Sequence, residues 1–110
     1  MHCIELENTR PSCEGVVTWF LMEYLPKSLF FLVVEEKDLS EEGVDGWCIR
    51  ETHNEFLIQI HKGIEDPYMY KRVLLHELWH MYQYYRNLPR NEDETLKQEH
   101  TLLNKYHQNH

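Results

Sequence analysis

The first half of the chain alternates short apolar runs with polar or turn-forming segments, a pattern that predicts one helix and three strands. After a polar start, Ser12 can cap a helix over about 13–25, which Pro26 ends. Apolar residues lie nearly all round this segment, so a strand also fits the pattern, but the length favours a helix. The β-branched and aromatic run at 28–36 is typical of a buried strand.

Two further apolar segments, 47–50 and 55–61, follow an acidic loop that contains two glycines. The residues between them, Thr52-His53-Asn54, predict a β-hairpin. Apolar residues occupy alternate positions of the second segment, so one of its faces is expected to point into a core; these residues are Phe56, Ile58 and Ile60.

The second half of the chain predicts two helices. Asp66 is a favourable N-cap and Pro67 a favourable first residue for a helix that reaches to about residue 86 and is apolar on most faces. A break at 88–90 follows, and 91–94 (Asn-Glu-Asp-Glu) resemble a capping box at the start of a last helix, which extends to about residue 106 before a polar tail. The element order predicts a single α+β domain over 1–110, in which an N-terminal helix backs a small three-stranded sheet.

The charge balance and the cysteines exclude several classes of protein. The chain has 11 Lys and Arg against 19 Asp and Glu, a formal net charge of −8. Nucleic acids and anionic membranes bind basic faces, so neither is expected as a partner. The longest apolar run, 16–22, is too short to cross a bilayer, and the residues before it lack the basic start of a secretory signal. The odd number of cysteines, three, argues against a disulfide framework, and the lack of a C-x-x-C pair argues against a thiolate zinc ribbon. We expect an intracellular, cytoplasmic protein.

The central predicted helix carries the main candidate for chemistry, because 76–80 read His-Glu-Leu-Trp-His, the pattern H-E-x-x-H. Positions i and i+4 share a helix face, so His76 and His80 can direct imidazole nitrogens at one metal ion. Zinc suits two imidazoles and a carboxylate with one position open to water. Glu77 is the predicted general base, which takes a proton from the attacking water and returns it to the leaving amine. Histidines without partners are costly to bury in an apolar helix, so a metal site is favoured over a purely structural role.

The third ligand is expected from the last helix, which offers Glu92, Glu94, Glu99 and His100. Glu99 falls in an apolar stripe with Leu96 and Leu103, where a lone carboxylate would need a partner. Helix geometry also favours Glu99 as the third ligand. The central helix runs roughly 9 Å past His80 before it turns, so the residue level with His80 should lie about six to eight positions into a helix that runs back alongside. Glu99 is therefore the predicted third ligand, and His100 and Glu94 are the second and third choices.

An H-E-x-x-H helix followed by a turn and a glutamate on the next helix resembles the gluzincin metallopeptidases. The small size and the order of elements are similar to those of the minigluzincins, and ImmA/IrrE-type peptidases share much of this plan. Gly46-Trp47 and the alternating segment 56–60 also look like the sheet strand that precedes the active-site helix in those families. In SprT-like proteins a histidine stands in place of the glutamate, which keeps His100 open as a ligand.

The resemblance implies zinc-dependent hydrolysis of a peptide or unfolded protein that lies extended along the sheet edge. It also implies a side chain that stabilises the oxyanion, for which the candidates are Tyr82, Tyr85, Tyr106 and His107. Minigluzincins are latent forms with a terminal segment over the cleft, so the tail 106–110 is expected to cover the site. The alternatives are a non-catalytic, zinc-stabilised binding or accessory module and a metal-free structural domain.

Overall fold

The computed structural model describes residues 2–110 and contains three helices and a four-stranded mixed sheet, which confirms the predicted α+β class. The helices are α1 (Ser12–Tyr24), α2 (Pro67–Tyr85) and α3 (Glu92–Asn109). The strands are β1 (His2–Glu7), β2 (Phe30–Lys37), β3 (Gly46–Thr52) and β4 (Glu55–His61).

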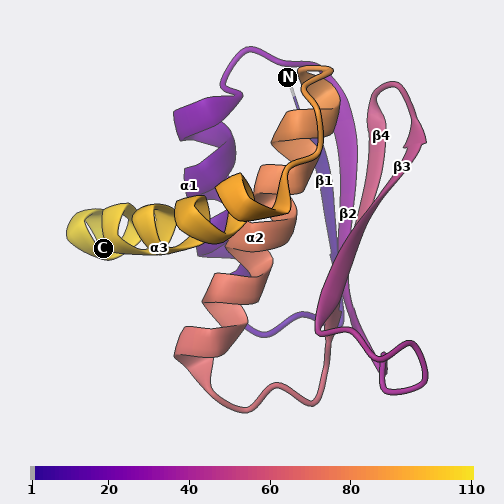
Figure 1. The fold of residues 1–110 in the computed structure, drawn as a ribbon, viewed down its shortest axis with the longest axis vertical. Helices are drawn as coiled ribbons and strands as arrows, with labels where there is room; N and C mark the ends of the chain where they lie inside the picture. The colour runs from indigo at the N-terminus through magenta and orange to yellow at the C-terminus, as the bar shows by residue number, and fades with distance from the viewer. Residues whose placement is uncertain (1) are drawn as a thin grey trace.

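The sheet has the strand order β1-β2-β4-β3. β1 and β4 both pair with β2 in parallel, and β3 pairs with β4 antiparallel, which confirms the predicted hairpin. All three helices lie on one face of the sheet (Figure 1), and no helix within residues 2–110 covers the other face. α2 packs against β3 and β4 and also against α1 and α3, so the H-E-x-x-H helix lies at the centre of the domain.

β1 is the strand that the sequence did not predict, and the expected three-stranded sheet is wrong by this one strand. Leu6 pairs in register with the buried Val34, so Ile4 and Leu6 face the helices. The alternate residues Cys3, Glu5 and Glu7 face away from them. A short edge strand whose residues are mostly exposed carries a weak apolar signal, and only its pairing with β2 identifies it as a strand.

Two of the three helices begin with a side chain that caps the first turn. The Asp66 carboxylate accepts a hydrogen bond from the backbone N–H of Tyr68 (2.9 Å), and the Asn91 side chain accepts one from the N–H of Glu94 (3.1 Å), so both predicted caps are confirmed. Ser12 is not a cap, because the N-cap of α1 is Pro11 and makes no side-chain capping bond.

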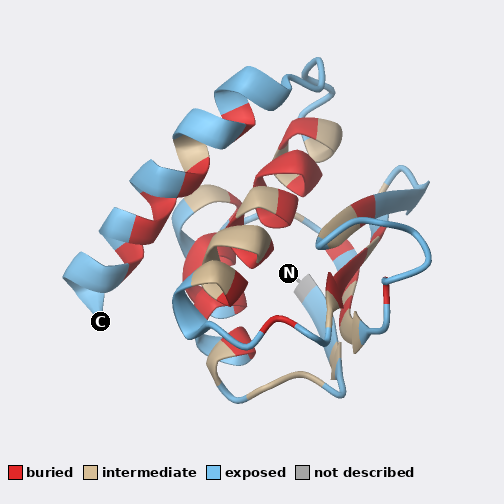
Figure 2. Ribbon diagram, turned by 60° about the horizontal axis from the view of Figure 1, so that its bottom comes forward, coloured by how far each residue is buried: buried red, intermediate tan, exposed pale blue. Residues whose placement is uncertain are grey.

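Buried residues of α2 and α3 lie where the two helices face each other, while the outward side of α3 is exposed (Figure 2). Glu99 lies on the buried side, as the sequence predicts, with only 4% of its surface exposed. Leu96, expected in the same stripe, is 50% exposed, and the buried apolar residues of α3 are Leu102, Leu103 and Tyr106. No helix in residues 2–110 combines the length and the apolar character needed to span a membrane.

A partly buried ion pair joins the loop before α1 to the end of β2. Arg10 Nη2 lies 2.9 Å from Glu36 Oε1, and the Arg10 backbone N–H donates to Glu36 Oε2 over 2.6 Å. Tyr70 of α2 donates its hydroxyl to the same carboxylate over 3.2 Å. Burial alone would raise the pKa of Glu36, but the hydrogen bonds from Arg10 outweigh it and hold the pKa below its usual value. The Glu36 carboxylate therefore holds three separate segments together.

Replacing Glu36 by glutamine is expected to lower the free energy of unfolding at pH 7 by about 2 kcal/mol, because charge-assisted hydrogen bonds are lost. Since the pKa of Glu36 is lower in the folded state, its stabilisation is complete above the unfolded value of 4.5 and is lost as the pH falls through the folded pKa. Urea unfolding should therefore show the wild type and Glu36→Gln converging in acid. Glu42→Gln, in an exposed loop, is the control and should match the wild type. A difference that does not change with pH would contradict this role.

Candidate metal centre

His76 and His80 lie one turn apart on α2, and their rings converge, as the sequence predicts. The two Nε2 atoms are 3.2 Å apart. His80 is buried, with 1% of its side chain exposed, and the His76 side chain is 16% exposed. Burial lowers the pKa of His80 and so favours the neutral imidazole that a metal requires.

On the side of each ring away from the two Nε2 atoms, Nδ1 lies within hydrogen-bond distance of an acceptor. His76 Nδ1 lies 2.8 Å from Glu99 Oε2, and His80 Nδ1 lies 2.9 Å from Gln83 Oε1. In the neutral tautomer with its hydrogen on Nδ1, His76 donates that hydrogen to Glu99. With the hydrogen on Nδ1, the lone pair of a neutral ring is on Nε2, where a metal would bind.

The Gln83 amide is oriented so that it can accept a hydrogen bond from the same tautomer of His80. Gln83 Nε2 donates to Thr95 Oγ1 (3.4 Å), and Thr95 Oγ1 in turn donates to the backbone carbonyl of Asn91 (2.8 Å). Gln83 and Thr95 are both buried, at 1% and 0% exposure. This chain of donors leaves Gln83 Oε1 free to accept from His80 Nδ1, so the Nε2 lone pairs of both histidines point at the same place.

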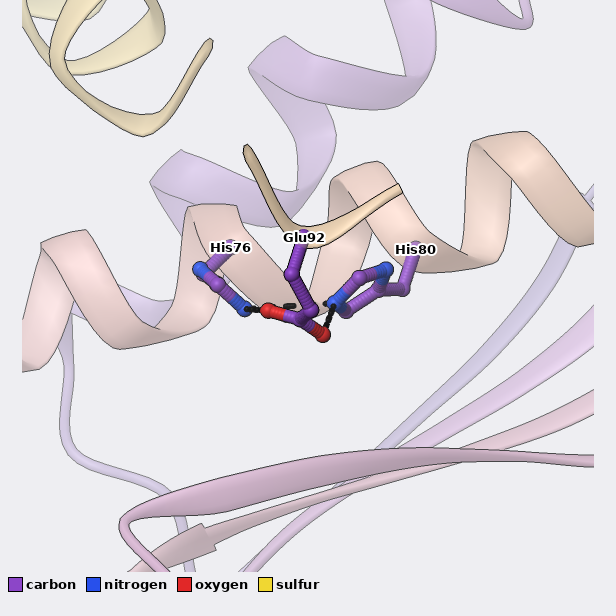
Figure 3. Close-up of side chains that lie close together, drawn as sticks. All are labelled: His76, His80 and Glu92. Carbon is purple, nitrogen blue, oxygen red and sulfur yellow. Dashed lines mark hydrogen bonds and ion pairs between the residues drawn. The ribbon is translucent and has the colours of Figure 1, made fainter. Parts of the chain in front are cut away.

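Glu92, in the first turn of α3, provides the carboxylate nearest to these lone pairs. Its Oε1 lies 2.8 Å from His80 Nε2 and its Oε2 lies 3.3 Å from His76 Nε2 (Figure 3). Arg90 holds the same carboxylate from the preceding loop, with Nη2 3.1 Å from Oε1. His76, His80 and Glu92 offer three ligand atoms within 4.8 Å of one another, so this group could hold a metal ion.

The structure places Glu99 beside the metal centre but on its far side. The Glu99 carboxylate contacts Nδ1 of His76 and Nε of Arg72, the latter at 3.1 Å. That is the position of a carboxylate that orients a ligating histidine. His100 is exposed, and Glu94 accepts a hydrogen bond from Trp79 Nε1 (3.3 Å), so neither is part of the group at the Nε2 atoms.

Glu92 was one of four candidates in the sequence but was not ranked above Glu99, because the predicted register assumed that α3 itself runs back along α2. In the structure the loop that connects the two helices runs back along α2, so α3 begins close to the middle of α2 (Figure 1). Glu92 therefore reaches the histidines from the first turn. One feature of the sequence does point to Glu92: it lies about two helical turns before Glu99, so the two carboxylates share a helix face.

Glu77 is buried next to the histidines, with 5% of its surface exposed, and its Oε1 has no hydrogen-bond partner among the described residues. Burial raises the pKa of Glu77 to about 7. The residue lines a cleft of ≈ 200 Å³ between the start of β3, α2 and α3. The lining residues are Asp45, Gly46, Arg72, Val73, His76, Glu77, Leu96 and Glu99.

None of the four candidates for an oxyanion-stabilising side chain lines this cleft. Tyr82 stacks on Trp79, and Tyr85 packs against aromatic residues of β2 and β4. Tyr106 packs edge-on against Trp19, and His107 is exposed in the last turn of α3. The cationic side chain that does line the cleft is Arg72, which no sequence pattern singles out.

The C-terminal segment does not lie over the histidines, contrary to the expected latent arrangement. Residues 107–109 continue α3, and His110 Nδ1 bonds to the carbonyl of Tyr106 (2.9 Å). His110 also lines a groove on α1 with Trp19 and Met22, and Figure 1 shows the C-terminus at the far end of α3 from the connection to α2.

Comparisons of this chain with protein-family models, with curated proteins and with solved structures found no match. The functional interpretation therefore rests on the geometry and chemistry of the site.

Proposed function

We propose that this protein is a zinc-dependent peptide hydrolase in which His76, His80 and Glu92 hold the metal and Glu77 is the general base. The observation that carries the proposal is the meeting of two Nε2 atoms 3.2 Å apart beside the Glu92 carboxylate, while each Nδ1 lies within hydrogen-bond distance of an acceptor; with their hydrogens on Nδ1, both histidines would turn an Nε2 lone pair toward the same place. Two lone pairs with a carboxylate beside them repel one another unless a cation lies among them. Nitrogen ligands at about 2.0–2.1 Å from a tetrahedral zinc are roughly 3.3 Å apart, so the donor set fits zinc.

When bound, zinc would supply a Lewis acid that polarises a peptide carbonyl and activates water. Glu77 then has the role of moving a proton, because it lines the cleft and its Oε1 receives no hydrogen bond from residues 2–110. A pKa of about 7 lets Glu77 both accept and return a proton near neutral pH. Arg72 lines the same cleft and is the group we assign to the developing negative charge on the carbonyl oxygen.

The position of the cleft supports an extended peptide as the substrate. β3 is an edge strand, paired only with β4, and the cleft begins at Gly46, the first residue of β3. An extended chain can add to such an edge through main-chain hydrogen bonds, which bind without reading the sequence. Main-chain binding of this kind accepts many sequences but needs an extended chain, so we propose that unfolded proteins or flexible peptides are the substrates.

The test of the proposal begins with the metal. After dialysis against zinc and then against buffer, the purified protein is expected to retain about one zinc per chain, and His76→Ala is expected to retain none, because one of the two imidazoles is lost. Hydrolysis of dye-labelled, denatured casein should follow the zinc: it should disappear on chelation and return when zinc is added. His53→Ala, in an exposed turn, is the control and should bind zinc like the wild type.

A protein that retains zinc but does not cleave the labelled casein would contradict the hydrolase and support a zinc-stabilised binding module. A protein that retains no zinc would contradict both, and the two histidines would then share a proton.

A further inference from the structure

The face of the sheet that points away from the helices, called here the outer sheet face, carries a continuous apolar stripe. The stripe consists of Phe31, Val33, Leu57, Ile49 and Trp47. Val33 pairs in register with Leu57, and Leu57 pairs with Ile49. Phe31 and Ile49 are 49% and 39% exposed. A continuous apolar surface of this kind is unusual on a protein that acts alone and indicates an interaction site.

Acidic side chains flank the stripe. Alternation along β1 puts Glu5 and Glu7 on the outer sheet face, and the register puts Glu35 and Glu55 on it as well. Lys37, at the end of β2, is the one Lys or Arg that the strand register places on this face within residues 2–110. The surface is therefore apolar along its centre and negative around it.

A hollow of ≈ 210 Å³ opens at one end of the stripe, on β1, β2 and β4. Its lining combines apolar side chains with two carboxylates; the residues are Cys3, Glu5, Phe31, Leu32, Val33 and Glu55. A lysine or arginine side chain fits this chemistry, because its aliphatic stem can cover Phe31 while its charged end reaches Glu5 or Glu55.

We propose that the outer sheet face is a docking surface for a basic, amphipathic segment of a partner protein, whose apolar side covers the stripe and whose cations pair with the glutamates. The charge of the face argues for this occupant. A second copy of the chain would bring two acidic faces together, and anionic membranes and nucleic acids would be repelled. The surface lies on the opposite side of the sheet from α2, so the proposal does not depend on the proposed hydrolase activity.

Cys3 provides a direct test, since it lies in the hollow and is exposed, whereas Cys13 and Cys48 are buried. The probe is a synthetic amphipathic helix of leucine and lysine with all leucines on one face, roughly 18 residues long. Saturating probe is expected to slow the reaction of Cys3 with a thiol reagent about tenfold, because the bound helix covers the hollow. The same helix with glutamate in place of lysine should leave the reaction rate unchanged.

Matched charge variants separate a specific site from general attraction. Glu5→Lys/Glu55→Lys is expected to weaken binding of the probe about tenfold in calorimetry, because two ion pairs are replaced by repulsion. Glu41→Lys/Glu42→Lys has the same net charge but alters an exposed loop away from the sheet, and it should bind within about twofold of the wild type. Equal weakening by both pairs, or probe binding without protection of Cys3, would overturn the proposal. So would concentration-dependent dimerisation that buries Cys3, which would assign the face to a second copy.

Discussion

Replacement of Glu77 by glutamine is expected to lower the rate of peptide hydrolysis about 10²- to 10⁴-fold, the usual contribution of a positioned general base. Glutamine has nearly the same shape but cannot accept a proton from the attacking water. The zinc content should remain that of the wild type, because Glu77 is not in the group of ligand atoms formed by His76, His80 and Glu92. Hydrolysis of the labelled, denatured casein and zinc analysis of the same samples would measure both effects.

The stability of Glu77→Gln provides an independent check on the fold. Glu77 is buried, and no residue in 2–110 gives its Oε1 a hydrogen bond, so the neutral amide removes the cost of burying a charge. The melting temperature should therefore stay the same or rise, and loss of activity could not be attributed to unfolding. Glu65→Gln, at an exposed residue just before α2, is the matched control and should keep full activity. Full activity in Glu77→Gln would remove the residue from the proposed mechanism.

Replacement of Glu92 by glutamine is expected to weaken zinc binding about 100-fold or more, since the carboxylate beside both Nε2 atoms is lost. Glu99→Gln is expected to have a smaller effect, about 10-fold, because Glu99 orients His76 through Nδ1. Glu94→Gln should bind zinc like the wild type, since Glu94 contacts Trp79. Competition with a chromogenic zinc chelator would measure all three affinities.

The order of these affinities distinguishes the two carboxylates. A larger loss for Glu99→Gln than for Glu92→Gln would mean that Glu99 binds the metal directly, as the sequence predicts, with a turned His76 ring. Glu92 would then be dispensable for zinc binding and could turn away from the histidines, since half of its side chain is exposed. A crystal structure of the zinc-loaded protein would show the ligand atoms directly.

The elements predicted most accurately were those set by neighbours in sequence. Asp66 and Asn91 begin α2 and α3 through hydrogen bonds to residues two or three positions away. The hairpin of β3 and β4 likewise follows from a short turn between apolar segments. The convergence of His76 and His80 has the same local origin, because four residues make about one helical turn.

The features that the sequence did not reveal depend on contacts between distant segments. β1 is stabilised as a strand by its pairing with β2, although the whole of α1 separates the two strands along the chain. Thr95 joins the hydrogen-bond chain from Gln83 to His80 only because α3 packs against α2. Neither Gln83 nor Thr95 has a sequence pattern that would distinguish it from an ordinary buried polar side chain.

The sequence by itself therefore determined the α+β class, the two caps and the pair of histidines, because these follow from backbone hydrogen bonding and helix periodicity over a few residues. The tertiary structure decided which carboxylate meets the histidines. Glu92 and Glu99 both face α2, and the path of the connection before α3 brings Glu92 to Nε2 and Glu99 to Nδ1 of His76. That path is set by the packing of one helix on another, which the local chemistry of the chain does not specify.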